Sequence, residues 1–193
     1  MTSIEPLKLS QLLEAAFFVS DAPLNIKQLK TELLVNYKVS HQEIRDVITQ
    51  LVIKYKDSGI NLVKVASGYR FETITMLSDD LAFFVAKLNK EKAPKYSRSL
   101  LETLALIAYK QPITRGEIEE IRGVAVSSNI MKTLLERNWV KVVGNKEVPG
   151  RPSLYATTKI FLDYFSLTSL TQLPELLPMA ELGATDKPIE EMV

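Results

Sequence analysis

One order of secondary structure occurs twice along the chain, and this repeat limits the possible folds more than any other feature. In the first half, apolar residues at helical spacing predict three helices, which begin near Lys8, Asn25 and Ser40. Two strands are predicted next, at 60–66 and 69–75, with a short turn between them. Three helices followed by a hairpin is the order of a winged helix-turn-helix domain.

The second half of the chain has the same order. Helices are predicted from 97–99, after Thr114 and after Ser127, and β-like segments follow at 139–143 and 153–157. Residues at corresponding places are also alike. The Leu-Glu pairs that begin at residues 13 and 101 lie 88 positions apart, and the prolines at 23 and 112 lie 89 apart. We therefore predict tandem winged helix-turn-helix domains, mainly α with small β wings (α+β).

Composition along the chain sets the limits of these domains. Residues 89–97 are charged, contain Pro94 and hold almost no apolar side chain, which is typical of a linker. We predict an N-terminal winged-helix domain at 1–90, a C-terminal winged-helix domain at 97–166 and an extension at 167–193. Periodicity is poor towards the end of the extension, which predicts mobility there.

The residue types that most catalytic and metal sites need are scarce. The chain has no cysteine and a single histidine, His41, so thiol chemistry and disulfides are excluded and a metal site would need clustered carboxylates. The densest carboxylate cluster, Glu117, Glu119 and Glu120, splays around a short helix. No phosphate-binding glycine loop or hydrolase signature occurs. We predict no enzyme activity, no cofactor, no metal and, without an apolar run of ~20 residues, no membrane span.

Winged helices commonly bind nucleic acid through their third helix. In the second half that helix carries polar residues of both charges: Asn129, Lys132, Glu136 and Arg137. The formal net charge of the chain is only +1, and carboxylates that face phosphate weaken binding. Tight, sequence-specific DNA binding is therefore not indicated, and a DNA-binding transcription regulator is the alternative function.

The loop between the second pair of strands contains Pro149, Gly150, Arg151 and Pro152. Two prolines around a glycine predict a rigid turn. Arg151 at its tip also suits contact with a phosphate or with a carboxylate of a partner. Both interpretations stay open, because one loop can serve both purposes.

Three apolar side chains lie on otherwise polar helix faces, a pattern typical of interfaces. Phe18 shares its face with polar residues of the first helix. Phe83 lies opposite the predicted core stripe of the helix after Ser78, and Leu106 lies among charged residues of a helix in the second half. That stripe consists of Leu81, Phe84, Val85 and Leu88. For each of the three, contact with a partner is one alternative, and contact with a broad core or with the other domain is an equal one.

The second half contains a set of motifs that strongly resembles bacterial segregation and condensation protein B. The set comprises 101–115, 117–119, 121–124, Pro149–Pro152 with Leu154-Tyr155, Thr157-Thr158, Phe161-Leu162, Ser169-Leu170 and Leu173-Pro174. The match is close over about 97–177, whereas 1–90 match in pattern and length only. Two positions depart from the family: Asn145 replaces a common wing arginine, which weakens any wing–DNA contact, and Ala156 replaces a glycine.

The resemblance implies a non-enzymatic accessory subunit of the bacterial condensin complex. Such proteins form homodimers, mainly through the N-terminal domain, and bind a segment of the kleisin, segregation and condensation protein A. The kleisin in turn bridges the heads of the SMC ATPase, and the complex acts in chromosome condensation and segregation during cell division. We therefore expect a cytoplasmic, nucleoid-associated protein that contacts DNA weakly or indirectly.

The resemblance also directs the choice of site residues. Candidates for the dimer interface are Phe18 and Phe83. Candidates for kleisin binding in the second domain are Leu106 and Tyr109, as apolar anchors, and Arg122 and Arg151, as charged orienters at the rim.

Overall fold

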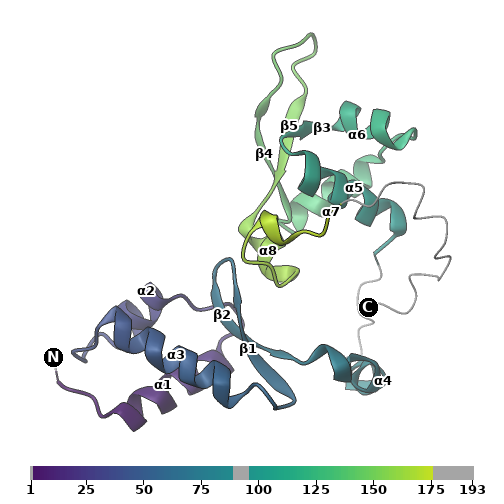
Figure 1. The fold of residues 1–193 in the computed structure, drawn as a ribbon. Helices are drawn as coiled ribbons and strands as arrows, with labels where there is room; N and C mark the ends of the chain where they lie inside the picture. The colour runs from purple at the N-terminus through teal and green to yellow at the C-terminus, as the bar shows by residue number, and fades with distance from the viewer. Residues whose placement is uncertain (1, 89–95, 176–193) are drawn as a thin grey trace.

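The computed structural model describes residues 2–88 and 96–175 (Figure 1). Within these residues two hydrophobic clusters form, one from each half of the chain. Each half has three helices, a hairpin and one further helix in the same order, so the expected tandem winged helix-turn-helix fold, mainly α with small β wings, is confirmed. The predicted linker falls largely outside the described residues, as does the end of the extension, at 176–193.

The N-terminal half begins with three helical segments. Its elements are α1 (Pro6–Val19), α2 (Ile26–Gln28), the π-helical turn η1 (Leu29–Leu33), α3 (His41–Lys54), β1 (Ile60–Val65), β2 (Gly68–Thr73), the 3-10 turn η2 (Thr75–Leu77) and α4 (Ser78–Leu88). The predicted caps are confirmed. The side chain of Asn25 accepts a hydrogen bond from the N–H of Gln28, and that of Ser40 from the N–H of Glu43. Each cap satisfies an N–H group that the helix leaves unpaired.

One apolar stripe from each long helix forms the N-terminal cluster. Leu13 and Phe17 of α1 are buried, as are Ile44 and Leu51 of α3. The wing contributes Leu62 from β1. Burial of such a stripe, rather than the intrinsic preference of the residues, supplies most of the stability of helices of this length.

The C-terminal half repeats this plan with one additional strand. Its elements are α5 (Arg98–Lys110), β3 (Ile113–Thr114), α6 (Arg115–Arg122), α7 (Ser128–Glu136), β4 (Val140–Asn145), β5 (Ser153–Thr157), α8 (Lys159–Tyr164) and the 3-10 turn η3 (Leu170–Gln172). The helices begin at side-chain caps, which are Ser97, Thr114, Ser127 and Thr158. Gly123 ends α6 with φ 69°, the left-handed conformation expected at that place.

The short strand β3, which the sequence pattern did not predict, joins the wing to the helices. Ile113 lies opposite Tyr155, so the three-stranded sheet has the order β3-β5-β4. The N-terminal half makes the same connection as a single bridge, in which Leu24 and Tyr69 exchange two backbone hydrogen bonds of 2.9 Å. In both halves the residue before the N-cap of the second helix therefore pairs with the wing.

Aromatic rings complete the C-terminal cluster. Trp139 is buried, and its ring centroid lies 5.1 Å from that of Tyr96 and 4.6 Å from that of Tyr164. The guanidinium of Arg137 lies over the Tyr96 ring at 4.8 Å, a cation–π contact. Tyr96, the penultimate residue of the predicted linker, is thus packed into the second half.

The predicted core stripe of α4 is wrong at two positions. Phe84 is 56% exposed and Val85 is 43% exposed. Figure 1 shows why: α4 lies at the end of an arm that leaves the hairpin of β1 and β2, away from the N-terminal helices. Helical spacing predicts an apolar face but does not identify the surface that covers it. The side chain of Phe83 lies outside the described part of the structure.

The first prediction concerns Gly68, which begins β2 beside the bridge to Leu24. A Cβ atom at Gly68 would lie 2.3 Å from the carbonyl carbon and oxygen of Leu24. Gly68→Ala should therefore reduce the free energy of unfolding by about 1–3 kcal/mol in denaturant titrations, as overpacking does. The matched control is Gly116→Ala in α6, where the added methyl meets nothing within 4 Å. The control should gain about 0.5–1 kcal/mol. A denaturation midpoint of Gly68→Ala equal to that of the wild type would contradict the close approach of residue 68 to the backbone of Leu24.

Candidate interaction surfaces

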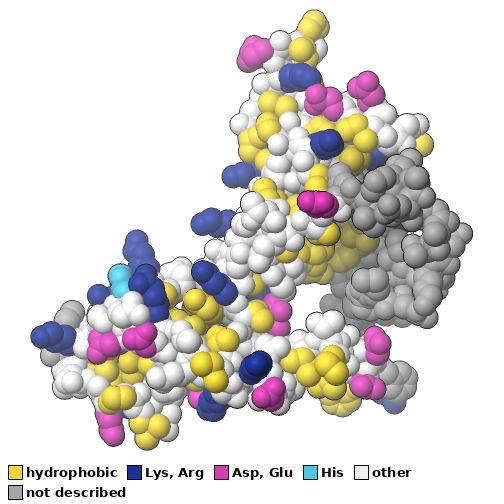
Figure 2. Space-filling view, viewed as in Figure 1, with side chains coloured by type: hydrophobic (Ala, Val, Ile, Leu, Met, Phe, Trp, Pro, Cys, Tyr) yellow, Lys and Arg dark blue, Asp and Glu magenta, His cyan; other side chains and the backbone are white. Residues whose placement is uncertain are grey.

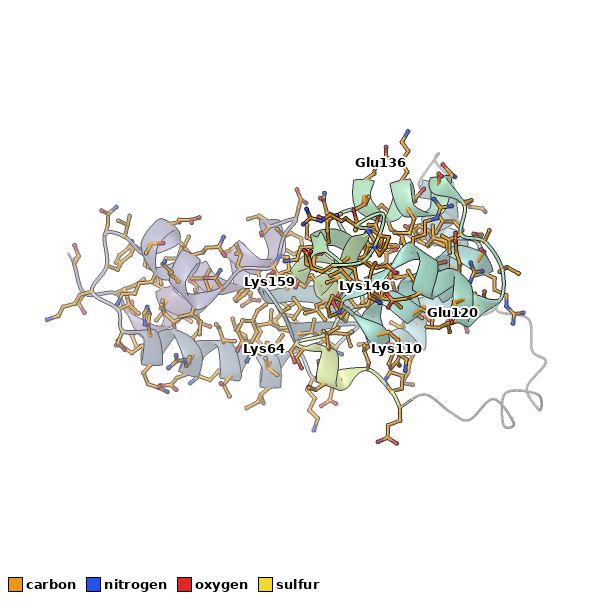
Figure 3. All side chains as sticks on the ribbon, turned by 90° about the horizontal axis from the view of Figure 1, so that it is seen from above. Lys64, Lys110, Glu120, Glu136, Lys146 and Lys159 are labelled. Atoms are coloured by element: carbon orange, nitrogen blue, oxygen red, sulfur yellow. The ribbon has the colours of Figure 1, made fainter. Side chains whose placement is uncertain are left out.

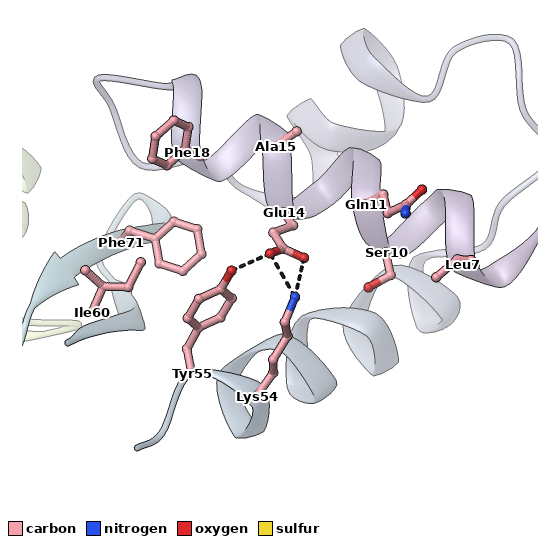
Figure 4. Close-up of a pocket in the computed structure, with 10 residues that line it drawn as sticks. All are labelled: Leu7, Ser10, Gln11, Glu14, Ala15, Phe18, Lys54, Tyr55, Ile60 and Phe71. Carbon is pink, nitrogen blue, oxygen red and sulfur yellow. Dashed lines mark hydrogen bonds and ion pairs between the residues drawn. The ribbon is translucent and has the colours of Figure 1, made fainter. Parts of the chain in front are cut away.

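A groove of about 530 Å³ lies on the N-terminal half between α1, the end of α3 and the wing (Figure 4). It is open and largely apolar. Its lining residues are Leu7, Ser10, Gln11, Glu14, Ala15 and Phe18 of α1, Lys54 and Tyr55 at the end of α3, Ile60 of β1 and Phe71 of β2. A shallow apolar groove of this kind suits a side chain or helix of another protein better than an enclosed small molecule.

A polar cluster crosses the middle of the groove. The ammonium of Lys54 donates hydrogen bonds to both carboxylate oxygens of Glu14, at 2.8 and 2.9 Å, and the Tyr55 hydroxyl donates to the same carboxylate. The bond from Lys54, followed by that from Tyr55, lowers the pKa of Glu14. The carboxylate in turn raises the pKa of the Tyr55 hydroxyl. The cluster connects α1 with the end of α3. It therefore fixes the relative position of these two elements in the middle of the groove, between its two apolar ends.

Phe18, a predicted interface residue, stands at one end of this groove, beside Phe71 in the view of Figure 4. Phe18 is 76% exposed, the condition expected of a residue that contacts a partner. Leu7 and Val19 of the same helix are also exposed. Figure 2 shows hydrophobic side chains at the surface of the N-terminal half and of the arm that carries α4. The sequence reasoning identified Phe18 but not the groove, because Tyr55 and Phe71 come from distant parts of the chain.

The other predicted anchors lie on α5. Leu106 is half-buried and packs against the C-terminal cluster. Tyr109, one helical turn later, donates a hydrogen bond of 2.6 Å from its hydroxyl to the carbonyl of Pro174. Leu173 also packs against the cluster. The beginning of the extension therefore lies at this face of α5, which the sequence pattern did not predict.

Arg122 and Arg151 occupy different environments. The side chain of Arg122 is 8% exposed, and its Nη2 donates to Ser99 Oγ at 2.9 Å and to Glu102 at 3.0 Å. Arg122 thus connects the end of α6 with α5, and it lowers the pKa of the Glu102 carboxyl. Arg151 lies in the exposed wing loop, and its guanidinium pairs with Glu147 at 3.1 Å. Figure 1 shows that this loop projects away from α5, so the structure does not bring Arg151 to the Leu106 face.

The wing loop has the geometry that its prolines and glycine predict. Gly150 has φ 82° and Arg151 has φ 38°, both in the left-handed region. Asn145, which departs from the family pattern, donates from its side-chain amide to the carbonyl of Arg151 at 2.9 Å. The loop is closed further by a hydrogen bond of 2.9 Å from the N–H of Lys146 to the carbonyl of Pro152. Asn145 therefore supports the shape of the loop.

Three basic side chains on or near the third helix of the second half have partners within the chain, whereas Lys141 of β4 is exposed. Lys132 lies 3.7 Å from Glu136, Lys146 lies 2.6 Å from Glu117, and Arg137 stacks on aromatic rings. In Figure 3 the labelled lysines project from several different elements, with Glu120 and Glu136 among them. A DNA-reading surface would instead present unpaired cations along one helix and its wing.

The described residues offer little chemistry. No group of three or more histidine, aspartate and glutamate side chains that could hold a metal ion occurs among them. His41 begins α3 on the surface. Nor does that part of the chain contain a helix with the length and apolar character to cross a bilayer.

Comparison with known proteins gives one consistent result. The family model described as "Segregation and condensation complex subunit ScpB" matches residues 11–176. The chain belongs to this ScpB family. A segregation and condensation protein B homolog of Coxiella burnetii is 47% identical over 171 residues, which cover 89% of this chain and 80% of that protein. Segregation and condensation protein B of Carboxydothermus hydrogenoformans is 38% identical, with 91% of each chain covered.

A solved structure of ScpB from Mycobacterium tuberculosis is 28% identical to this chain. The comparison covers 86% of this chain and all of that one, with a TM-score of 0.40. The ScpB family match extends over both halves of the fold, although the recognisable motifs of the sequence are concentrated in the second half. The resemblance stated from those motifs is thereby confirmed.

The second prediction concerns the pH dependence of the link between wing and helix in this ScpB-family chain. The ion pair with Lys146, followed by hydrogen bonds from Thr114, lowers the pKa of Glu117 from 4.5 to about 2. A lowered pKa contributes stability that is present above the ordinary value and is lost as pH falls through the folded value. The contribution of Glu117 should therefore be complete above about pH 5 and should disappear between about pH 4.5 and 2.

Urea titrations of the wild type and of Glu117→Gln should show a difference in stability at pH 7 that shrinks as pH falls through this window. The matched control is Glu120→Gln, on the same helix and exposed, which should show no such convergence. A constant difference between wild type and Glu117→Gln down to pH 2.5 would contradict the assignment.

Proposed function

We propose that this protein is a non-enzymatic, dimeric scaffold of the segregation and condensation complex that binds the kleisin, segregation and condensation protein A. Through the kleisin it would act on the heads of the SMC ATPase, in chromosome condensation and segregation during cell division. The observation that carries this proposal is the family match over residues 11–176. The open, largely apolar groove beside Phe18 agrees with a role in binding.

The N-terminal half is the proposed site of dimerisation. Phe18, Leu7 and Val19 expose apolar surface on α1 beside a groove whose far wall is the wing. In a two-fold symmetric dimer the same patch serves both partners, so a protruding ring beside a groove can be complementary to itself. Phe83 remains a second candidate on α4, with its side chain outside the described residues.

The face of α5 is the proposed site of kleisin binding. Leu106 and Tyr109 lie one turn apart and therefore on the same face of the helix. Leu106 is only half-buried, whereas the hydroxyl of Tyr109 already binds the carbonyl of Pro174 in the extension. Arg122 would act indirectly, by holding Glu102 and Ser99 of α5 in place. Arg151, which lies away from this face, would make a separate contact at the wing. A kleisin segment that orders on binding must bury apolar anchors to offset its lost chain entropy.

DNA contact is proposed to be weak or indirect, and the protein to be cytoplasmic and associated with the nucleoid. The paired state of Lys132 and Lys146 supports this view. The alternative, a transcription regulator, would bind a specific duplex with nanomolar-scale affinity that falls steeply between about 50 and 200 mM salt. A scaffold would bind the same duplexes weakly and without sequence preference.

The third prediction tests the dimer surface. Truncation of a buried interface aromatic often costs about 2 kcal/mol or more, which is roughly thirtyfold in the dissociation constant. Phe18→Asp, Phe83→Asp or both should therefore shift the monomer–dimer equilibrium by at least that factor in sedimentation equilibrium. Val124→Asp, at an exposed apolar position in the second half, is the control and should leave the equilibrium unchanged. If both phenylalanine variants stay folded and dimeric at low micromolar concentration, these residues do not form the interface.

The fourth prediction tests the α5 face. Leu106→Glu should abolish co-purification with the kleisin, because a few apolar anchors dominate such interfaces. Arg151→Ala should have a small effect on capture, since Arg151 lies in the exposed wing loop, away from α5, and exposed charges contribute little.

Ala105→Glu introduces the same charge on the exposed side of the same helix and is the matched control. Circular dichroism must show that Leu106→Glu is folded, and if it is not, Tyr109→Ala takes its place. A folded Leu106→Glu protein that still co-purifies stoichiometrically with the kleisin would exclude this helix and point to the N-terminal groove.

A further inference from the structure

The wing of the N-terminal half reaches the C-terminal half of the chain (Figure 1). Ala66 and Ser67 form the turn between β1 and β2. The N–H of Ala66 donates to the carbonyl of Leu167 at 2.9 Å, and the N–H of Ser67 donates to Asp163 Oδ1 at 2.9 Å. Asp163 lies in the last turn of α8, so two consecutive N–H groups of the turn bind the end of that helix.

A second contact lies beside the first. The hydroxyl of Ser166 donates to Glu72 Oε1 of β2 at 2.7 Å. Arg70 of the same strand donates to that oxygen through Nε and Nη2, at 2.8 and 2.6 Å, and its Nη2 lies 3.4 Å from Ser166 Oγ. Both contacts therefore join the N-terminal wing to the residues that end α8.

The geometry at the end of α8 does not by itself explain why residue 166 is a serine. The helix ends in a Schellman motif, in which the N–H of Leu167 donates to the carbonyl of Leu162 at 2.8 Å and the N–H of Ser166 to that of Asp163 at 3.2 Å. Ser166 has φ 54°, a conformation that glycine adopts without strain and serine does not. A serine at this position adds the hydroxyl that binds Glu72, and strain of this kind points to a function.

Without the wing, the position of the Asp163 carboxylate would also be energetically unfavourable. It is only 9% exposed, and burial of an unpartnered carboxylate is costly. The C-terminal end of a helix additionally disfavours negative charge. The N–H of Ser67 supplies a hydrogen bond to this carboxylate from the other half of the chain.

The tip of the wing is covered on the side that faces away from its own cluster. Leu62 of β1 belongs to the N-terminal cluster. Val65 lies three residues later and so on the opposite face of the strand, yet it is as fully buried as Leu62. Val65 adjoins Ala66, whose N–H binds the carbonyl of Leu167 in the C-terminal half.

We propose that the N-terminal wing is an internal latch that fixes the orientation of the two halves. Residues 65–72 form one part of the latch and residues 163–167 the other. The latch occupies the wing tip, which in a DNA-binding winged helix contacts the nucleic acid backbone. It also fixes the distance between the groove on α1 and the face of α5. Loss of the latch contacts would therefore change the distance and relative orientation of these two surfaces. This inference does not depend on which partners those surfaces bind.

The test measures the distance between the halves in the full chain, without any partner protein. The chain has no cysteine, so Lys30→Cys on η1 and Lys132→Cys on α7, both exposed, provide two unique sites for spin labels. Labelled protein is mixed with an excess of unlabelled protein, so that a labelled dimer carries one labelled protomer. Double electron–electron resonance should give a single narrow distance distribution for the wild-type latch.

Removal of both carboxylates, in Asp163→Ala with Glu72→Ala, should broaden the distribution about twofold or more, since independent motion is the default for domains without a large interface. Asp46→Ala is the matched control, because its carboxylate binds Gln42 on the same helix and is remote from the latch. Circular dichroism should show that all these variants are folded.

Ser166→Gly is a second variant. Glycine adopts the positive φ of this position without strain, and the change removes the hydroxyl that binds Glu72. It should broaden the distribution without loss of thermal stability, and it decides the question if the double variant does not fold. A wild-type distribution that is already broad would overturn the latch. A distribution that stays narrow in Ser166→Gly and in a folded double variant would overturn it as well.

Discussion

The pairing of the wing with the residue before the N-cap of the second helix is the constraint on which each half depends. A two-stranded hairpin is marginal in isolation and needs a further strand or a packed helix. Here Tyr69 pairs with Leu24, and Tyr155 pairs with Ile113, immediately before a capping residue that starts the next helix. One short stretch of backbone thus positions the wing and the helix together. The approach is close enough that residue 68 has no room for a Cβ atom.

This constraint leaves the outer surfaces of the helices free for binding. α1 buries one stripe and exposes Phe18 on another, and α5 buries one stripe and leaves Leu106 half-covered. Three ion pairs hold elements of the fold together: Glu14 binds Lys54, Glu117 binds Lys146, and Arg122 binds Glu102. The exposed apolar side chains are suited to contact with other proteins, which is the role proposed for this member of the ScpB family.

Local signals in the sequence predicted local structure well. Helical spacing and the caps Asn25, Ser40 and Thr114 placed the helices, and the strand at 153–157 was predicted to the residue. Features that depend on distant residues were missed, because periodicity carries no information about which surfaces meet. The exposed Phe84, the strand β3 and the contact of Tyr109 with Pro174 are examples. The family was recognised because its motifs are contiguous, whereas the groove at Phe18 joins separate segments.

The central claim is that this chain is a dimeric scaffold for a kleisin. Co-expression of the full chain with segregation and condensation protein A, followed by size-exclusion chromatography with light scattering, tests it most directly. The account predicts one species that contains the kleisin and whose mass requires two copies of this 21.7 kDa chain. Elution of the chain alone, at the mass of a monomer and separate from the kleisin, would contradict it.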